Sequence, residues 1–154
     1  NRSKIKTVLA LVAAVTAVVM LTTLSIGSDN DRTDTAANST TSHGDIPYSK
    51  AKLAELLEGG RPVFIDMTAS WCITCQVNKR VALTKPAVTS AFAENDVTVM
   101  VGDWTNRDPA ITEFLESFNR TGVPLYVLFD RSGKPQTLPQ ILSVDIVLKR
   151  IKSL

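Results

Sequence analysis

Hydrophobic and polar positions divide the 154-residue chain into three stretches of different pattern. Residues 7–27 are almost entirely apolar and carry no charge, whereas residues 28–44 are rich in Ser, Thr, Asn and Asp. Residues 45–154 alternate short apolar runs with amphipathic stretches. We therefore predict a transmembrane helix with a basic flank in residues 1–27, a flexible linker in residues 28–44 and one folded domain in residues 45–154.

The apolar run is long enough to cross a bilayer, which takes about 20 residues in a helix. A secretory signal peptide is the alternative, but its apolar region is normally shorter and is followed by a small-x-small cleavage site. The positive-inside rule predicts that the chain after the run lies on the side away from the cytoplasm. The charges behind this orientation are Arg2, Lys4 and Lys6 before the run, and Asp29 and Asp31 after it.

In residues 45–154 the pattern predicts helices that alternate with strands. Ser49 is a candidate N-cap for a helix that Gly59 ends, and the continuous apolar runs are typical of buried strands. The last two strands follow each other through one turn, which favours an α/β fold with a mixed sheet and helices on both faces. Helices are predicted over residues 50–58, 72–83, 86–92, 109–118 and 144–151, and strands over residues 62–67, 97–101, 125–129 and near 137–138.

Composition narrows the classes of function. The net charge is +2, with no basic stripe interleaved with aromatic residues, so nucleic-acid binding is not expected. The two cysteines, Cys72 and Cys75, are too few for a disulfide scaffold or a structural zinc site, and His43 lies far upstream. Gln76 stands where a c-type haem attachment needs histidine. Redox chemistry of the C-x-x-C pair remains, with no metal and no cofactor beyond a Cys72–Cys75 disulfide.

The C-x-x-C pair is predicted to sit where a strand gives way to a helix. If the helix starts at Cys72, its first amides and its dipole favour the thiolate, which is the form that attacks disulfides. Cys75 then lies one turn away, within bonding reach. We assign Cys72 as nucleophile and Cys75 as the buried resolving thiol; an ordinary buried thiol is the alternative that the spacing disfavours.

Two neighbours of the cysteines are further candidates. Asp66 interrupts an apolar strand, and a buried carboxylate is unfavourable unless it is used or neutralised. We predict that it accepts the proton of Cys75, with a pKa raised by burial; a hydrogen-bonded turn carboxylate is the alternative. Trp71 is expected to cap the edge of the core, to form an apolar wall beside the nucleophilic sulfur, or to do both, since the two roles are compatible.

These motifs carry a family resemblance. Asp66, Trp71 and the C-x-x-C pair, followed by Gly122-Val123-Pro124, resemble the thioredoxin superfamily over residues 45–154. More narrowly, residues 64–75, 102–109 and 122–126 are similar to the C-terminal periplasmic domain of the DsbD thiol:disulfide interchange family, and residues 7–27 then match the last transmembrane helix of its membrane domain. The resemblance implies a thioredoxin-like fold, a cis Pro124 against the disulfide and backbone pairing of Val123 with substrate.

The resemblance also implies a place in an electron relay. In that family, electrons pass from cytoplasmic thioredoxin to the membrane domain, then to this domain and then to the N-terminal periplasmic domain. We therefore expect an inner-membrane-anchored, periplasmic protein-disulfide reductase whose partners are a membrane redox domain as electron donor and disulfide-bearing periplasmic proteins. The dipeptide Ile73-Thr74 differs from the Pro-His of strongly oxidising sites and the Gly-His of protein disulfide isomerases.

Two alternatives and one departure remain. The chain can be a free-standing tethered reductase for cytochrome c maturation, or a non-catalytic redox-sensing or binding module. The departure is Lys79, at a position where the DsbD family often carries glutamate. Because a cation favours nearby thiolates, the family's redox potential does not transfer to this chain.

Overall fold

The structure, a computed structural model, describes residues 45–154. The predicted transmembrane helix and linker lie outside the described residues, and within residues 45–154 no helix has the length and apolar character needed to cross a membrane. The strands are β1 (Ile46–Pro47), β2 (Val63–Thr68), β3 (Thr98–Asp103), β4 (Leu125–Phe129) and β5 (Pro135–Thr137). The helices are α2 (Lys50–Glu58), α3 (Ile73–Asn78), α4 (Pro86–Glu94), α5 (Pro109–Ser117) and α6 (Val144–Ile151), and a π-helix η1 (Lys79–Leu83) continues α3.

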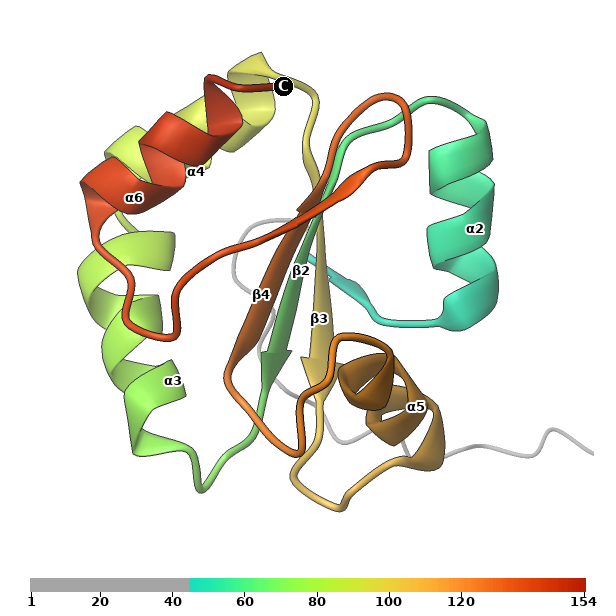
Figure 1. Ribbon diagram of the computed structural model, residues 1–154. Coiled ribbons are helices and arrows are strands. Elements are labelled where there is room, and N and C mark those ends of the chain that lie inside the picture. Colours follow the sequence, from blue (N-terminus) through green and yellow to red (C-terminus); the bar gives the residue numbers. More distant parts are fainter. Residues whose placement is uncertain (1–44) are drawn as a thin grey trace, which may run out of the picture. The chain divides into compact units, whose positions relative to one another are not determined.

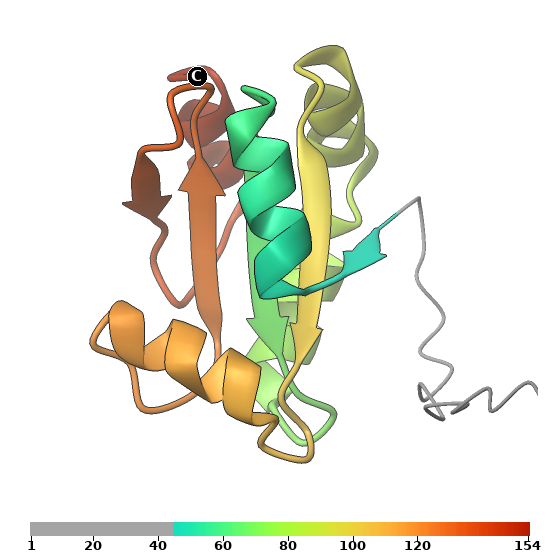
Figure 2. The same ribbon diagram turned by 90° about the vertical axis from the view of Figure 1, so that its right-hand side faces the viewer.

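The five strands form one sheet in the order β1-β3-β2-β4-β5. The sheet is mixed, as the sequence predicts. β1, β3 and β2 are parallel, whereas β4 is antiparallel to β2 and β5 is antiparallel to β4. Helices α2 and α5 cover one face, and α3, α4 and α6 cover the other (Figures 1 and 2). β2 therefore lies at the centre, which explains why its sequence is a nearly continuous apolar run.

Alternation along β2 builds two apolar clusters. Val63, Ile65 and Met67 belong to the cluster under α2 and α5, while Phe64 belongs to the cluster under α4 and α6. Because side chains of a strand alternate between the two faces, Asp66 shares the face of Phe64, on the side of α3 and η1. The central strand thus places a carboxyl group on the side of the sheet that α3 and η1 cover.

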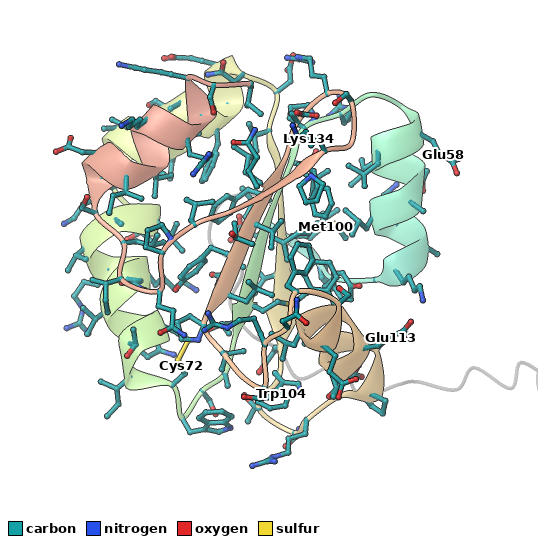
Figure 3. All side chains as sticks on the ribbon, in the orientation of Figure 1. Glu58, Cys72, Met100, Trp104, Glu113 and Lys134 are labelled. Atoms are coloured by element: carbon teal, nitrogen blue, oxygen red, sulfur yellow. A yellow bond between two sulfur atoms is a disulfide. The ribbon has the colours of Figure 1, made fainter. Side chains whose placement is uncertain are left out.

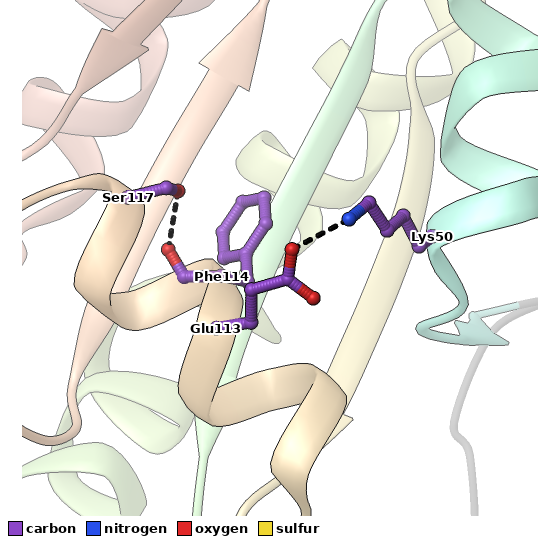
Figure 4. A network of polar contacts seen from close by, with 4 residues as sticks. All are labelled: Lys50, Glu113, Phe114 and Ser117. Carbon is purple, nitrogen blue, oxygen red and sulfur yellow. Dashed lines mark hydrogen bonds and ion pairs between the residues drawn. The ribbon is translucent and has the colours of Figure 1, made fainter.

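The two helices on the opposite face are linked at the surface. Lys50 Nζ at the start of α2 lies 2.6 Å from Glu113 Oε1 on α5 (Figure 4). In the same view, the hydroxyl of Ser117 donates to the carbonyl oxygen of Phe114 in the last turn of α5 at 2.6 Å. Both partners of the ion pair are exposed, so its contribution to stability is small, about 1 kcal/mol or less.

Most predicted elements are present, with three differences. The two-residue strand β1 was not predicted, because Ile46–Pro47 is too short to show a pattern. The helix predicted to run to Leu83 changes to π geometry at Lys79, where Thr84 N donates to Lys79 O at 3.0 Å. The second predicted strand extends two residues further, to Asp103, because it pairs with β2 in parallel up to Thr68.

Candidate active site

The C-x-x-C pair lies at the carboxyl end of β2, where the chain turns into α3 (Figure 3). Cys72 is the N-cap residue of α3, and its sulfur accepts a hydrogen bond from the backbone N–H of Cys75 at 3.2 Å. The two residues form a disulfide with an S–S distance of 2.02 Å and a Cα–Cα distance of 5.3 Å. The predicted start of the helix is therefore confirmed, and a backbone donor of the first turn points at the Cys72 sulfur.

Cys72, Cys75 and the loop before β4 pack together. The two cysteines are 6% and 3% exposed, and Val123 packs against them and Ala69. The Val123–Pro124 peptide bond is cis, as the family resemblance implies. Because β4 is antiparallel to β2 and Leu125 is paired with Met67, the chain just before Leu125 lies beside the carboxyl end of β2.

Trp71 is half-exposed and is held by a loop from another part of the sequence. Its indole Nε1–H donates to Thr105 O at 3.2 Å, and Ser70 N donates to Thr105 Oγ1 at 2.8 Å. The ring of Trp71 lies 6.0 Å from that of Trp104, which is buried. With 52% of its surface exposed, Trp71 is not a core residue.

The supporting roles of Trp104 and Thr105 were not predicted. They lie in the β3–α5 loop, where Trp104 N donates to Thr68 O at 2.7 Å and so ties this loop to the end of β2. Asp103 Oδ1 accepts hydrogen bonds from the N–H and the hydroxyl of Thr105. The sequence alone does not show that this loop contacts Ser70 and Trp71. That contact depends on the parallel pairing of β2 and β3, which brings the ends of the two strands together.

Large apolar side chains are exposed on α3, on η1 and in the loop before α6. Ile73 is 79% exposed, and Val77 and Val81 follow it at four-residue spacing on α3 and η1. Ile141, from the loop before α6, is also exposed. Trp71 and Ile73 flank Cys72 in the sequence, so that exposed apolar side chains lie on both sides of this cysteine, which suits contact with another protein.

Asp66 lies on β2, six residues before Cys72, and is 8% exposed. Its Oδ1 has no hydrogen-bond partner among residues 45–154. Burial raises the pKa of Asp66 to about 7; the positive charge of Lys79 opposes this rise, and the negative charge of Asp45 adds to it. All three residues line a pocket of about 630 Å³ with otherwise mainly apolar walls.

A polar contact between α3 and β4 lies on the same side of the sheet. Asn78, 1% exposed, donates through Nδ2 to Tyr126 Oη at 3.0 Å and to Gln140 O at 2.6 Å, and its Oδ1 accepts from Leu142 N at 3.0 Å. Burial and the charge of Asp66 raise the pKa of Tyr126, against the hydrogen bond from Asn78. Neither Asn78 nor Tyr126 was predicted as a site residue. The sequence did hold one indication, because Asn78 falls on the side of its helix that faces the core.

The arrangement is suited to reversible disulfide chemistry. Two bonded sulfurs lie at the N-terminus of α3, a buried carboxyl group lies on the adjacent strand β2, and exposed apolar side chains flank Cys72. Within residues 45–154 no group of three or more His, Cys, Asp or Glu side chains is placed to hold a metal ion.

The sequence of this chain is similar to a known protein family and to individual known proteins. Residues 45–131 match the thioredoxin-like family. The chain is 34% identical over 95 residues to the thiol:disulfide interchange protein DsbD of Actinobacillus pleuropneumoniae, covering 60% of this chain and 16% of that protein. It is 35% identical over 83 residues to DsbD 1 of Pseudomonas aeruginosa, covering 54% of this chain and 14% of that protein. The chain thus spans about a sixth of the length of these relatives.

Solved structures show the same fold. The reduced C-terminal domain of DsbD from Neisseria meningitidis has a TM-score of 0.58 at 20% identity, covering 70% of this chain and 98% of that domain. A thioredoxin from Thermus thermophilus has a TM-score of 0.57 at 18% identity, covering 72% of this chain and 87% of that protein.

Proposed function

Because the chain belongs to the thioredoxin-like family, we propose that its C-x-x-C pair reduces disulfides of other proteins by thiol–disulfide exchange. The observation that carries the proposal is the Cys72–Cys75 disulfide at the carboxyl end of the central strand. The Cys72 sulfur accepts a hydrogen bond from the first turn of α3, and a buried Asp66 lies on the strand behind it. These features favour a thiolate at Cys72 and supply a proton acceptor for the second step.

The reaction begins with the reduced pair. The Cys72 thiolate attacks one sulfur of the partner's disulfide, so that a Cys72–partner disulfide forms while the partner's second sulfur leaves as a thiolate and takes a proton from water. Asp66, as a carboxylate, then takes the proton from Cys75 Sγ. The Cys75 thiolate attacks Cys72 Sγ, the Cys72–Cys75 disulfide forms, and the partner's first sulfur leaves. A second dithiol must supply two electrons to reset the pair.

The surface around Cys72 fits a partner chain in extended conformation. Trp71 and Ile73 offer apolar contact on one side, and Val123, which packs against the cysteines, offers its backbone on the other. Pro124 follows Val123 through the cis peptide bond, directly before the first residue of β4. In this proposal Trp71, Val123 and Pro124 are the substrate-binding residues, and Cys72, Cys75 and Asp66 are the catalytic ones.

The similarity to DsbD proteins supports a more specific setting. We place residues 45–154 in the periplasm, anchored to the inner membrane by residues 7–27. There the pair receives electrons from a membrane redox domain and passes them to disulfide-bearing periplasmic proteins or domains. A stand-alone tethered reductase for cytochrome c maturation is the alternative within this chemistry. Sequencing the gene upstream of Asn1 decides between them, because a multi-span apolar region there favours the DsbD-like arrangement.

The test is a single turnover of the purified 154-residue chain. The chain is reduced, freed of reductant and mixed with a disulfide-bonded peptide; one peptide disulfide reduced per chain is expected. Cys72→Ala abolishes the exchange, whereas Cys75→Ala accumulates a mixed disulfide with the peptide. Equal trapping by both variants contradicts the assigned roles.

The same experiment separates the catalytic proposal from a binding module. A redox-sensing or binding module uses the groove beside Val123 and Pro124 to hold a partner without turnover. If the pre-reduced chain binds the peptide but leaves its disulfide intact, the reductase proposal is wrong. Asp66→Asn should slow release of the peptide thiol by about 100-fold, the usual size of a general-base contribution, with little loss of fold.

A further inference from the structure

Asn78 is a buried amide one turn after Cys75, and its orientation is fixed by its partners. Leu142 N can only donate, so Asn78 Oδ1 must face it, at 3.0 Å. Gln140 O can only accept, so Asn78 Nδ2 must face it, at 2.6 Å. The group that reaches Tyr126 Oη, at 3.0 Å, is therefore the N–H of Nδ2 and not the oxygen.

This orientation determines what the Tyr126 hydroxyl does. Its oxygen accepts the hydrogen bond from Asn78. A phenol carries one proton, and that proton is left to bind a different acceptor. The side chain keeps this proton at neutral pH, since burial raises the pKa of Tyr126. Tyr126 is thus neutral, and its hydroxyl proton has no hydrogen-bond acceptor among residues 45–154.

Asp66 provides the matching acceptor. It is directly opposite Tyr126 in the antiparallel pairing of β2 with β4. Directly opposite residues project from the same face, with Cβ atoms about 5 Å apart. Asp66 Oδ1 is buried and has no hydrogen-bond partner within residues 45–154. The negative charge of Asp66 also contributes to the raised pKa of Tyr126, so the two groups are within electrostatic reach.

We propose that Tyr126, held by Asn78, is a positioning residue for Asp66. The Tyr126 hydroxyl donates a hydrogen bond to one water molecule, which in turn donates to the Asp66 carboxylate and stabilises its charged form. No covalent bond changes, and the proton stays on Tyr126. The inference rests on the proposed function in one respect, namely that the charged carboxylate is the form that accepts the proton of Cys75.

The other charged groups around Asp66 act differently. Asp45, directly before β1, disfavours the carboxylate through its negative charge, and Lys79 on η1 favours it. Cys75 on α3 carries no titrating proton while the disulfide is closed. Tyr126 on β4 differs from these groups because it is an uncharged hydrogen-bond donor. Its effect on the ionisation of Asp66 should therefore persist at high salt, whereas the effects of Asp45 and Lys79 should weaken.

The experiment follows the Asp66 carboxyl directly. The oxidised 154-residue chain is labelled with ¹³C at the aspartate carboxyl carbons, and the Asp66 signal is identified by its loss in Asp66→Asn. Tyr126→Phe keeps the ring that packs against Phe64 and removes only the hydroxyl. We expect its Asp66 titration midpoint to rise, because the carboxylate loses a donor. Tyr48→Phe is the matched control, since that ring packs against Phe114 in the cluster on the opposite face of the sheet.

If the Asp66 midpoint in Tyr126→Phe equals the midpoint in Tyr48→Phe, the proposal is overturned. Asn78→Ala removes the bond that fixes the hydroxyl, and a smaller rise in the same direction supports the proposal; this variant decides the matter if Tyr126→Phe fails to fold. The titration needs no partner and no turnover, so a chain without exchange activity still shows whether Tyr126 acts on Asp66. A raised midpoint without a matching shift in the pH profile of exchange supports the positioning and overturns the role of Asp66 in resolution.

Discussion

Asp66 puts an ionisable group where the surroundings favour its neutral form. It is 8% exposed, its Oδ1 has no hydrogen-bond partner among the described residues, and burial is the main cause of its raised pKa. A pKa of about 7 means that the group exchanges a proton readily near neutral pH, which suits a general base.

Asp66 should make the chain less stable as pH rises from about 4 to about 7. Below the ordinary aspartate pKa of about 3.9 the carboxyl is protonated in both the folded and the unfolded chain. Above it, the unfolded chain releases the proton while the folded chain retains it up to a pKa of about 7, so the free energy of unfolding falls across this interval. Asp66→Asn should remove this slope and be more stable above pH 7, by up to about 4 kcal/mol.

Urea unfolding of the oxidised chain between pH 4 and pH 8 measures this effect. The parent chain and Asp66→Asn should have similar unfolding free energies at pH 4 and diverge as the pH increases. Parallel pH profiles for the two proteins would contradict a raised pKa at Asp66 in the folded state.

Lys79 should act on Asp66 through its charge alone. Its positive charge lowers the pKa of Asp66, against the effect of burial, and both residues line the same pocket. Lys79→Gln should therefore raise the Asp66 midpoint, and the rise should shrink in 1 M salt because Lys79 is exposed. Arg80→Gln is the matched control: it removes the same charge from the next residue, which does not line the pocket. Equal shifts in both variants would point to net charge and not to the position of Lys79.

At the scale of elements, β2 and α3 were the most predictable parts. The apolar run before Asp66 indicates a buried strand, and Cys72 does begin the helix turn that brings Cys75 within 5.3 Å between Cα atoms. The π geometry from Lys79 onward could not be predicted, because it depends on how η1 packs and not on the residue types in it. Strand β1 was missed because two residues give no periodicity.

β3 contains a glycine that the packing of β2 requires. At Gly102 an added Cβ would collide with Met67 Sδ and also approach Ile111 Cδ1 at 3.4 Å. Met67 is fully buried, so its side chain cannot swing into solvent. Gly102→Ala should lower the free energy of unfolding by about 1–3 kcal/mol, the usual penalty for overpacking.

Gly122→Ala is the control for that substitution. A Cβ there meets its nearest neighbour, Trp104 Cζ3, at 3.5 Å, which is ordinary contact. It should change stability much less than Gly102→Ala, as measured by urea unfolding of both variants in the oxidised form. A Gly102→Ala chain as stable as the Gly122→Ala chain would show that β2 and β3 can move apart without loss of stability.

At the scale of the whole molecule, the sheet assembles a site from segments that are distant in sequence. Thr105 reaches Trp71 because β3 is parallel to β2, and Val123 reaches the cysteines because β4 is antiparallel to β2. Residue patterns indicate the strands but not their register, so the pairing of Asp66 with Tyr126 could not be predicted from the sequence. The candidate catalytic residues could therefore be predicted from the sequence. The residues that contact and support them, such as Thr105 and Asn78, could not, because their contacts depend on how distant segments pair.

The direction of electron flow should be visible in the stability of the whole domain. Oxidation and unfolding form a thermodynamic cycle, so a folded state that favours the disulfide more than the unfolded chain does lowers the reduction potential. The chain-entropy model gives about 2 kcal/mol of stabilisation for a disulfide that closes a loop of four residues. A reductant should therefore be more stable when oxidised, whereas a strong oxidant owes its potential to a stabilised reduced form.

Urea unfolding of the oxidised and the reduced chain measures the difference. We expect the oxidised chain to have the larger free energy of unfolding, and each 1.4 kcal/mol of difference corresponds to about 30 mV in potential relative to the unfolded dithiol. Cys72→Ala combined with Cys75→Ala, unfolded with and without reductant, controls for effects of the reagent itself. A reduced chain that is more stable than the oxidised chain would place the potential above that of the unfolded dithiol. That result would argue against a reductant and for the opposite direction of the relay, while the exchange chemistry of Cys72 and Cys75 stayed the same.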